Sequence, residues 1–325
     1  KVLIIKLTSM GDLMHALPAV TEAKQKIPDL VFDWVADKNF SCVPKWHPAI
    51  NKVIETNHRE WKLNLFSSGS RNEIKQVIKT IEENNYDLIV DMQNNLKSSF
   101  VSFLCNHPVI GMDARSSREF PAHLAYKKKI NVPKEMHAIE RQKYLLSSAL
   151  DYKTDITNTD FGISKKNFIS SNSIPKGKYA ICVQNASWKT KQWHVDKWKE
   201  LTCLMEDKDI ELLFPSGNLN ELETAKEICS ASNKAFALDL LPLNEIASLI
   251  DQAEFTICSD TGLAHLSSVT NTPSLTLYGP TRTKLIGTYG KNQNHLEAFD
   301  SKIDNISVME VFSKLKDLES VSYTH

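Results

Sequence analysis

Short apolar runs with β-branched residues alternate along the chain with longer segments whose apolar positions repeat at helical spacing. Such alternation is typical of parallel sheets that are covered by helices on both faces. Pro18 should bend the first helix or delay its regular part. In the first half, this pattern predicts strands at 2–7, 31–36, 52–54, 88–91 and 109–111, and helices at 13–27, 71–84 and 135–150.

A polar segment, 153–178, separates this series from a second one and holds no period longer than a turn or two, which indicates a linker. The second series predicts strands at 179–183, 210–214, 235–238, 255–258 and 274–278, and helices at 194–206, 219–230, 243–252 and from Thr261. Because 325 residues exceed one typical core, we predict two domains, 1–155 and 177–304. A last amphipathic helix within 305–325 would pack either back on the first domain or on the second.

Two doubly wound α/β domains in tandem predict a ligand-binding cleft where the carboxyl ends of the strands meet. The chain lacks both G-x-G-x-x-G and G-x-x-x-x-G-K-[ST], which argues against a Rossmann dehydrogenase and a P-loop NTPase. Lysine plus arginine and aspartate plus glutamate both number 39, so a nucleic-acid binder with a broad basic surface is not expected.

The cysteines and the apolar runs limit the remaining possibilities. Six scattered cysteines without a C-x-x-C pair fit reduced thiols in a cytoplasmic protein. No His/Cys/Asp cluster has metal-ligand spacing, so no metal site is expected. No apolar run approaches the ~20 residues of a membrane span, although attachment to a membrane surface needs only a modest apolar and basic patch.

The segment 259–265, Ser-Asp-Thr-Gly-Leu-Ala-His, follows a predicted strand and begins a predicted helix. The first turn of a helix offers unpaired N–H groups, and Gly262 lets a phosphate approach the backbone. Thr261 and His265 are four residues apart and would share a face of the helix. The pattern therefore fits an anion site, but it also fits Asp260 or Thr261 as an N-cap and His265 as a packing residue.

Three further polar residues follow predicted strands. Asp12, after the first strand, suits a general base or a hydrogen-bond acceptor, and it also suits an N-cap. Lys191 can neutralise a phosphate, whereas the alternative, a solvated loop, fits Lys189 better. Glu221 is placed to meet ribose hydroxyls, or it supplies a favourable charge at a helix N-terminus.

Several motifs occur together along the chain, and they cover it from the first strand to about Gln293. They are Thr8-Ser9-Met10-Gly11-Asp12, Phe32-Asp33-Trp34-Val35, Gly111-Met112-Asp113, Arg118-Glu119, Lys191-Gln192-Trp193, the segment 259–265, Tyr278-Gly279-Pro280-Thr281 and the segment 286–293. This set resembles the lipopolysaccharide heptosyltransferases of glycosyltransferase family 9. The resemblance implies a GT-B fold with an amino-terminal acceptor domain and a carboxyl-terminal nucleotide-sugar domain.

The resemblance also implies an activity: inverting, metal-independent transfer of L-glycero-D-manno-heptose from ADP-heptose to the inner Kdo of Kdo2-lipid A, without a cofactor. It implies a cytoplasmic enzyme, peripheral on the inner face of the inner membrane. It makes Asp12 the general base and Lys191 the cation at the leaving diphosphate. The implied donor-binding residues are Ser187, Lys191, Glu221, Leu241, Asp260, Thr261, Gly262 and His265, and the acceptor-binding residues are Ser9, Met10, Gly11, Arg59, Lys62 and Arg118.

Two alternatives to this function stay open at the level of sequence. One is another GT-B glycosyltransferase with a different nucleotide-sugar donor. The other is a non-catalytic nucleotide- or glycan-binding protein, whose sign would be the loss of Asp12 or Lys191. Both residues are present.

Overall fold

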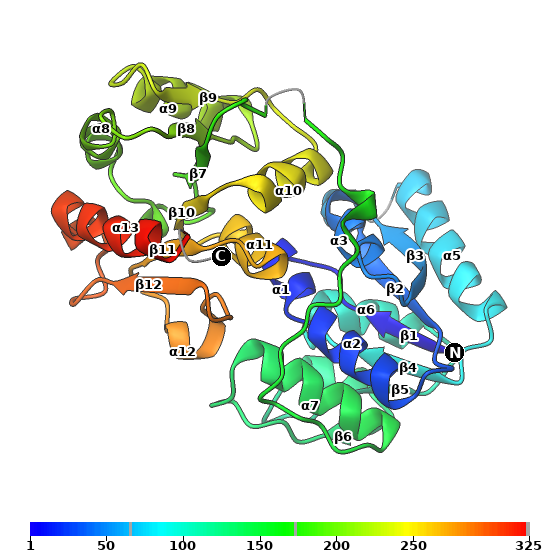
Figure 1. The fold of residues 1–325 in the computed structure, drawn as a ribbon. Helices are drawn as coiled ribbons and strands as arrows, with labels where there is room; N and C mark the ends of the chain where they lie inside the picture. The colour runs from blue at the N-terminus through cyan, green and yellow to red at the C-terminus, as the bar shows by residue number, and fades with distance from the viewer. Residues whose placement is uncertain (65–66, 172–173, 323–325) are drawn as a thin grey trace. The chain divides into compact units, whose positions relative to one another are not determined.

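The computed structural model describes residues 1–64, 67–171 and 174–322, without the side chains of Arg59, Lys62 and 317–322 (Figure 1). The chain forms two compact units, Lys1–Lys166 and Asn167–His325. The division between them falls inside the polar segment 153–178. In the described part of the chain, no helix has both the length and the apolar character needed to cross a membrane.

The first unit is a parallel six-stranded sheet in the order β3-β2-β1-β4-β5-β6, with helices packed around it (Figure 1). Its strands are β1 Val2–Ile5, β2 Phe32–Asp37, β3 Ile50–Thr56, β4 Leu88–Asp91, β5 Val109–Met112 and β6 Lys128–Ile130. Its helices are α1 Met10–Met14, α2 Leu17–Lys26, α3 Cys42–Lys45, α4 His58–Leu63, α5 Ser68–Glu83, α6 Leu96–Leu104 and α7 Ala138–Leu150, with 3-10 turns η1 Lys38–Phe40, η2 Phe120–Ala125 and η3 Lys165–Asn167, the last of which spans the division between the units.

The helix predicted at 13–27 is two helices, because Pro18 stands at the start of the second one. Pro18 lies in the first turn of α2, where its missing N–H costs nothing, and α1 ends four residues earlier at Met14. The expected delay of the regular helix is thus confirmed. The short α1 leaves Asp12 in a turn of helix directly after β1.

The second unit is also a parallel six-stranded sheet, in the order β12-β11-β10-β7-β8-β9. Its strands are β7 Tyr179–Val183, β8 Glu211–Phe214, β9 Ala235–Ala237, β10 Phe255–Ser259, β11 Ser274–Tyr278 and β12 Gln293–Glu297. Its helices are α8 Val195–Leu204, α9 Leu219–Cys229, α10 Leu243–Gln252, α11 Gly262–Thr270, α12 Thr283–Ile286 and α13 Val308–Ser322, with 3-10 turns η4 Lys189–Lys191 and η5 Ile303–Asn305.

Helix α13 packs within the second unit, against α8 and β11. Its side chains Val308, Val311 and Leu315 are buried in the core that also holds Trp193 and Trp198. Sequence alone left the partner of this helix undecided, because an amphipathic stripe shows that a helix packs but not on what.

Both sheets run outward in two directions from a central pair of strands, and this confirms the prediction of two doubly wound α/β domains. The direction reverses between β1 and β4 in the first sheet and between β7 and β10 in the second. At such a switch point the loops that leave the two central strands diverge, and ligands bind in the crevice between them.

Two strands and four helices were not predicted from the sequence pattern. Strand β6 consists mostly of exposed lysines, and β12 reads Gln-Asn-His-Leu-Glu, so neither has an apolar run. Both are edge strands, which bury less side-chain surface than the central ones. The missed helices are α3, α4, α6 and α12, which have at most nine residues each.

Candidate functional site

The first unit gathers polar groups at the switch point between β1 and β4. The N–H groups of Leu7 and Thr8, which follow β1, donate to the side-chain oxygen of Gln93, which follows β4, over 3.1 and 3.2 Å. Lys6 Nζ donates to the Met92 carbonyl over 2.8 Å. These bonds tie the segment between β1 and α1, which leads to Asp12, to the segment after β4.

Asp12 serves its own helix and still keeps one oxygen available. Its Oδ2 accepts from the Ser9 N–H over 3.0 Å and lies 3.4 Å from the Ser9 hydroxyl, which is the arrangement of a capping box. The same oxygen is 3.3 Å from Arg118 Nη1. Among the described residues, Oδ1 accepts no hydrogen bond, and the side chain is 30% exposed. The N-cap alternative is therefore wrong for Asp12, because Ser9 occupies the N-cap and Asp12 is the N3 member of the capping box. The unused Oδ1 is compatible with a proton-accepting role.

Lys6 is a further candidate site residue, which the sequence analysis did not single out. It is only 2% exposed and lies next to Leu7 at the end of β1. Burial lowers the pKa of Lys6 to about 8, and the nearby carboxylates of Asp12 and Asp91 oppose this shift. A lysine inside an otherwise apolar run is unusual, and that is the signal by which it is recognisable in the sequence.

The structure describes four of the six predicted acceptor-binding residues in full. Ser9, Met10 and Gly11 form the start of α1, with Ser9 exposed and Gly11 buried. Arg118 is brought to Asp12 across 106 positions of sequence. The side chains of Arg59 and Lys62 lie outside the described residues.

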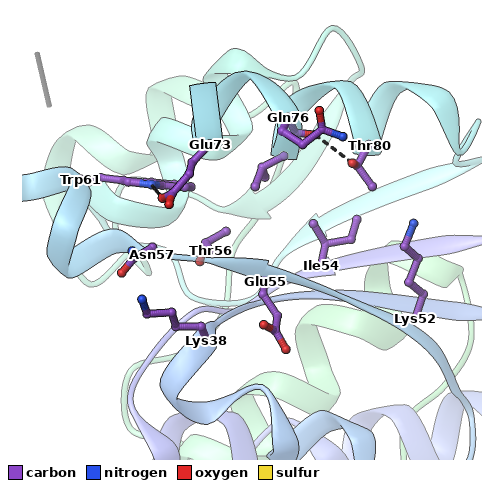
Figure 2. Close-up of a pocket in the computed structure, with 11 residues that line it drawn as sticks. Lys38, Lys52, Ile54, Glu55, Thr56, Asn57, Trp61, Glu73, Gln76 and Thr80 are labelled. Carbon is purple, nitrogen blue, oxygen red and sulfur yellow. Dashed lines mark hydrogen bonds between the residues drawn. The ribbon is translucent and has the colours of Figure 1, made fainter. Parts of the chain in front are cut away.

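A separate pocket of about 460 Å³ lies in the first unit between β3 and α5 (Figure 2). At its end the indole nitrogen of Trp61 donates to Glu73 Oε2 over 2.8 Å. Trp61 belongs to α4, the helix that also contains Arg59 and Lys62. The pocket is lined by Lys38, Lys52, Ile54, Glu55, Thr56, Asn57, Trp61, Glu73, Gln76, Val77 and Thr80, and none of the predicted site residues is among them.

In the second unit, the loops after β7 and β10 meet through an ion pair at the switch point. Lys191 Nζ lies 2.7 Å from Asp260 Oδ2. The Thr281 hydroxyl, which comes from the loop after β11, donates to the same oxygen. The carboxylate is 7% exposed and the lysine 24%, so the cation is the more accessible member of the pair.

The helix that follows, α11, begins without a side-chain cap. Thr261 occupies the N-cap position, yet its hydroxyl makes no capping hydrogen bond. In the described part of the chain, the N–H groups of Gly262 and Leu263 have no hydrogen-bond acceptor, and this is the arrangement in which a helix N-terminus binds an anion. His265 is half-buried in the first turn of the same helix. Thr261 therefore occupies the predicted N-cap position, but its side chain does not cap the helix.

Glu221, in the first turn of α9, accepts hydrogen bonds from the loop after β8. One of its carboxylate oxygens accepts from the Gly217 N–H over 2.8 Å, and the other accepts from the Asn218 side chain over 2.7 Å. The side chain also lines a pocket of about 200 Å³. Both amide atoms of Gln184 and the indole nitrogen of Trp198 are buried at this pocket and have no hydrogen-bond partner among the residues that the structure describes.

These unpaired atoms at Gln184 and Trp198 mark the pocket as a place where polar groups of a ligand or water would bind. The sequence analysis did not single out Gln184, although Gln184 directly follows a predicted strand.

The two remaining predicted donor residues lie in loops of this unit. Ser187 is exposed after β7, and Leu241 is half-buried between β9 and α10.

Comparison with known proteins identifies the class. The family described as glycosyltransferase family 9 (heptosyltransferase) matches residues 74–314. The chain belongs to this family and is a glycosyltransferase with a GT-B fold.

Particular relatives are similar over nearly the whole chain. Lipopolysaccharide heptosyltransferase 1 of Escherichia coli K12 is 35% identical, with 98% of this chain and 100% of the relative covered. The protein of that name from Pseudomonas aeruginosa is 34% identical over 91% of this chain and 83% of its own length. The solved structure of E. coli heptosyltransferase WaaC with ADP has a TM-score of 0.90 and 34% identity, with 98% of this chain and 99% of that one covered.

Proposed function

We propose that this glycosyltransferase transfers L-glycero-D-manno-heptose from ADP-heptose to the inner Kdo of Kdo2-lipid A, with inversion and without a metal ion. The observation that carries the proposal is the Lys191–Asp260 pair beside the uncapped N-terminus of α11. The similar proteins are named lipopolysaccharide heptosyltransferases, and WaaC has been solved with ADP-2-deoxy-2-fluoro heptose.

As the bond between heptose and ADP breaks, negative charge develops on the departing diphosphate. Displacement at an anomeric carbon passes through an oxocarbenium-like state, so groups that hold a developing anion lower the barrier. Lys191 supplies a cation, and Thr261, Gly262 and His265 line the first turn of α11. Asp260 positions Lys191 and meets heptose hydroxyls. Ser187 contacts the phosphates, while Glu221 and Leu241 receive the nucleoside.

The acceptor site needs a base for the attacking hydroxyl and positive charge for the anionic groups of the acceptor. Asp12 Oδ1 takes the proton from the Kdo hydroxyl as the new bond to the anomeric carbon forms, and the diphosphate leaves with the bonding electrons. Arg118, together with Arg59 and Lys62, pairs with the anionic groups of the acceptor. The start of α1, Ser9 to Gly11, contacts the sugar. Residues 1–155 would thus bind the acceptor and 177–304 the nucleotide sugar.

The chemistry of the two proposed substrates supports a cell location for the protein. ADP-heptose is a soluble nucleotide sugar, whereas Kdo2-lipid A is anchored in a bilayer by its acyl chains. We infer that the protein works in the cytoplasm, peripherally on the inner face of the inner membrane. No nucleic acid takes part.

Mass spectrometry of Kdo2-lipid A after incubation with ADP-heptose and the protein tests the proposal. One added heptose is expected, and ADP should be released in equal amount. The anomeric configuration of the new bond, determined by NMR, should be opposite to that of the donor. EDTA should leave the rate unchanged, because Lys191 and α11 hold the charge.

Two results would contradict this assignment. Faster transfer from a UDP- or GDP-sugar would indicate another GT-B glycosyltransferase, and binding of ADP and Kdo2-lipid A without ADP release would indicate a non-catalytic binding protein. A rate abolished by EDTA and restored by a divalent cation would disprove the metal-independent step alone.

Glu221→Ala should raise the KM for ADP-heptose by about 10–100-fold and change kcat by much less. The ribose would lose its hydrogen bonds to the Glu221 carboxylate, and a hydrogen bond to a charged group contributes about 1.5–3 kcal/mol. Steady-state kinetics measures this effect. Glu223→Ala is the matched control, because Glu223 lies in the same helix and is paired only with Lys226 among the described residues. Equal KM values in the two variants would remove Glu221 from the donor site.

A further inference from the structure

Five large apolar side chains are exposed on two neighbouring elements of the first unit. Leu96, Phe100 and Phe103 of α6 are 53%, 38% and 77% exposed, and Phe120 and Leu124 of η2 are 74% and 70% exposed. We call these five residues the α6–η2 patch. Single exposed apolar residues are ordinary, but a contiguous group of this kind marks an interaction surface.

The five side chains belong to one surface because α6 and η2 are packed against each other. The Leu96 N–H donates to Glu119 Oε2 over 2.7 Å, and the Arg118 N–H donates to the Asn94 carbonyl over 3.1 Å. The start of α6 is thereby tied to the residues that lead into η2.

Helix α6 presents apolar side chains on two faces. Leu96, Phe100 and Phe103 follow the four-and-three spacing of one helix face. Val101, by contrast, is buried in the core of the unit. A helix that only covered its sheet would be polar on the outside, so the outer face of α6 serves another partner.

The surroundings of the patch are basic, although the chain as a whole has no net charge. Residues 96–134 contain seven lysines and arginines and only two acidic residues. Lys97 lies next to Leu96 on α6, and three consecutive exposed lysines, Lys127 to Lys129, begin three residues after Leu124. Positive charge beside apolar side chains complements a surface with anionic head groups above an apolar layer.

The patch adjoins the proposed catalytic carboxylate. Arg118, which is bound to Asp12 at 3.3 Å, is two residues before Phe120 in the chain. A surface that holds a lipid layer at this place would bring the sugar end of a membrane-anchored acceptor close to Asp12.

We infer that the α6–η2 patch docks the protein on a bilayer rich in anionic phospholipid. Its apolar side chains enter the boundary between head groups and acyl chains, and the neighbouring lysines meet the phosphates. This inference rests on the proposed function, because it assigns the surface by which an enzyme with a lipid acceptor reaches that acceptor.

Vesicle sedimentation tests the inference with the full chain. Phosphatidylcholine vesicles with phosphatidylglycerol should bind the wild-type protein, and added salt should weaken the binding. The variant Phe103→Ser/Phe120→Ser/Leu124→Ser should bind on the order of 1,000-fold more weakly, because each of the three partly inserted side chains contributes about tenfold, or about 1.4 kcal/mol. The control Phe299→Ser/Met309→Ser changes two exposed apolar side chains of the second unit, and it should bind like the wild type.

A second variant addresses the charge. Lys127→Gln/Lys128→Gln/Lys129→Gln should weaken binding by about fivefold for each lysine near the membrane and should flatten the salt dependence. Its binding to vesicles of phosphatidylcholine alone should equal that of the wild type.

Enzyme assays separate this inference from the proposed function. The serine triple variant should keep wild-type turnover on a deacylated, water-soluble Kdo acceptor and lose it on Kdo2-lipid A in vesicles. Wild-type vesicle binding by this variant, or none by the wild-type protein, would overturn the docking inference without touching heptose transfer. Patch-dependent dimers without vesicle binding would also overturn it. If the wild-type protein bound vesicles through the patch but transferred no heptose to the soluble acceptor, the proposed function would be wrong and the docking inference would stand.

Discussion

Replacing Asp12 by asparagine should lower kcat for heptose transfer by about 10²–10⁴-fold, the range expected when a general base is lost. Asparagine can still accept the Ser9 N–H bond that closes the first turn of α1, so the local structure should persist. Its amide cannot take a proton from the acceptor hydroxyl. The affinity for ADP should stay nearly unchanged, because the donor-binding residues belong to the second unit. Single-turnover kinetics and calorimetric titration with ADP measure the two quantities.

The comparison variant is Ser9→Ala, which removes the hydroxyl 3.4 Å from Asp12 and its part in the capping box but keeps the carboxylate. Its kcat should fall far less than that of Asp12→Asn, and its main kinetic effect should be on the KM for the acceptor. If Asp12→Asn kept near-normal turnover, Asp12 would be a capping residue and another group would have to accept the proton. Asp12→Ala, which loses both roles, should be less stable than Asp12→Asn by about 1 kcal/mol.

Replacing Lys191 by methionine should lower kcat by about 10²–10³-fold, as is typical when one group that stabilises developing negative charge is removed. Methionine keeps much of the length of the side chain but leaves the leaving diphosphate without its cation. It also leaves the buried Asp260 carboxylate without its partner at 2.7 Å, so a lower melting temperature is expected. Lys191→Arg should recover part of the rate, because it restores the charge with a different geometry.

The matched control is Lys189→Met, two residues earlier in the same 3-10 turn, where the side chain is exposed. Its kinetics should equal those of the wild type. A Lys191→Met enzyme with normal kcat and a raised KM would show that the lysine binds substrate and transition state equally, which would contradict its role at the leaving group.

The central strands and long helices could be predicted because their signals are local. Strands β4, β7 and β11 have the predicted bounds, and α10 begins and ends at the predicted residues. Buried central strands read as continuous apolar runs. Edge strands such as β6 and β12 have no such apolar run, because their position is set mainly by hydrogen bonds to the neighbouring strand.

The candidate site was predictable only as a set of positions after strands. Asp12, Glu221 and Asp260 all follow predicted strands, and a parallel sheet brings such positions to one edge. Their partners could not be foreseen: nothing local joins Lys191 to Asp260 or Glu221 to the Gly217 N–H. The burial of Lys6 and the unpaired atoms of Gln184 likewise depend on side chains from distant parts of the chain.

The sequence by itself determined the alternation of strands and helices, the order of the two halves and the loops that carry polar residues, because hydrophobic periodicity and glycine or proline act over a few residues. The tertiary structure decided which polar atoms meet. It joined Asp12 to Arg118, left the first turn of α11 uncapped and turned apolar side chains of α6 outward. Those outcomes depend on contacts between residues far apart in the chain, and such contacts exist only after the sheet has assembled.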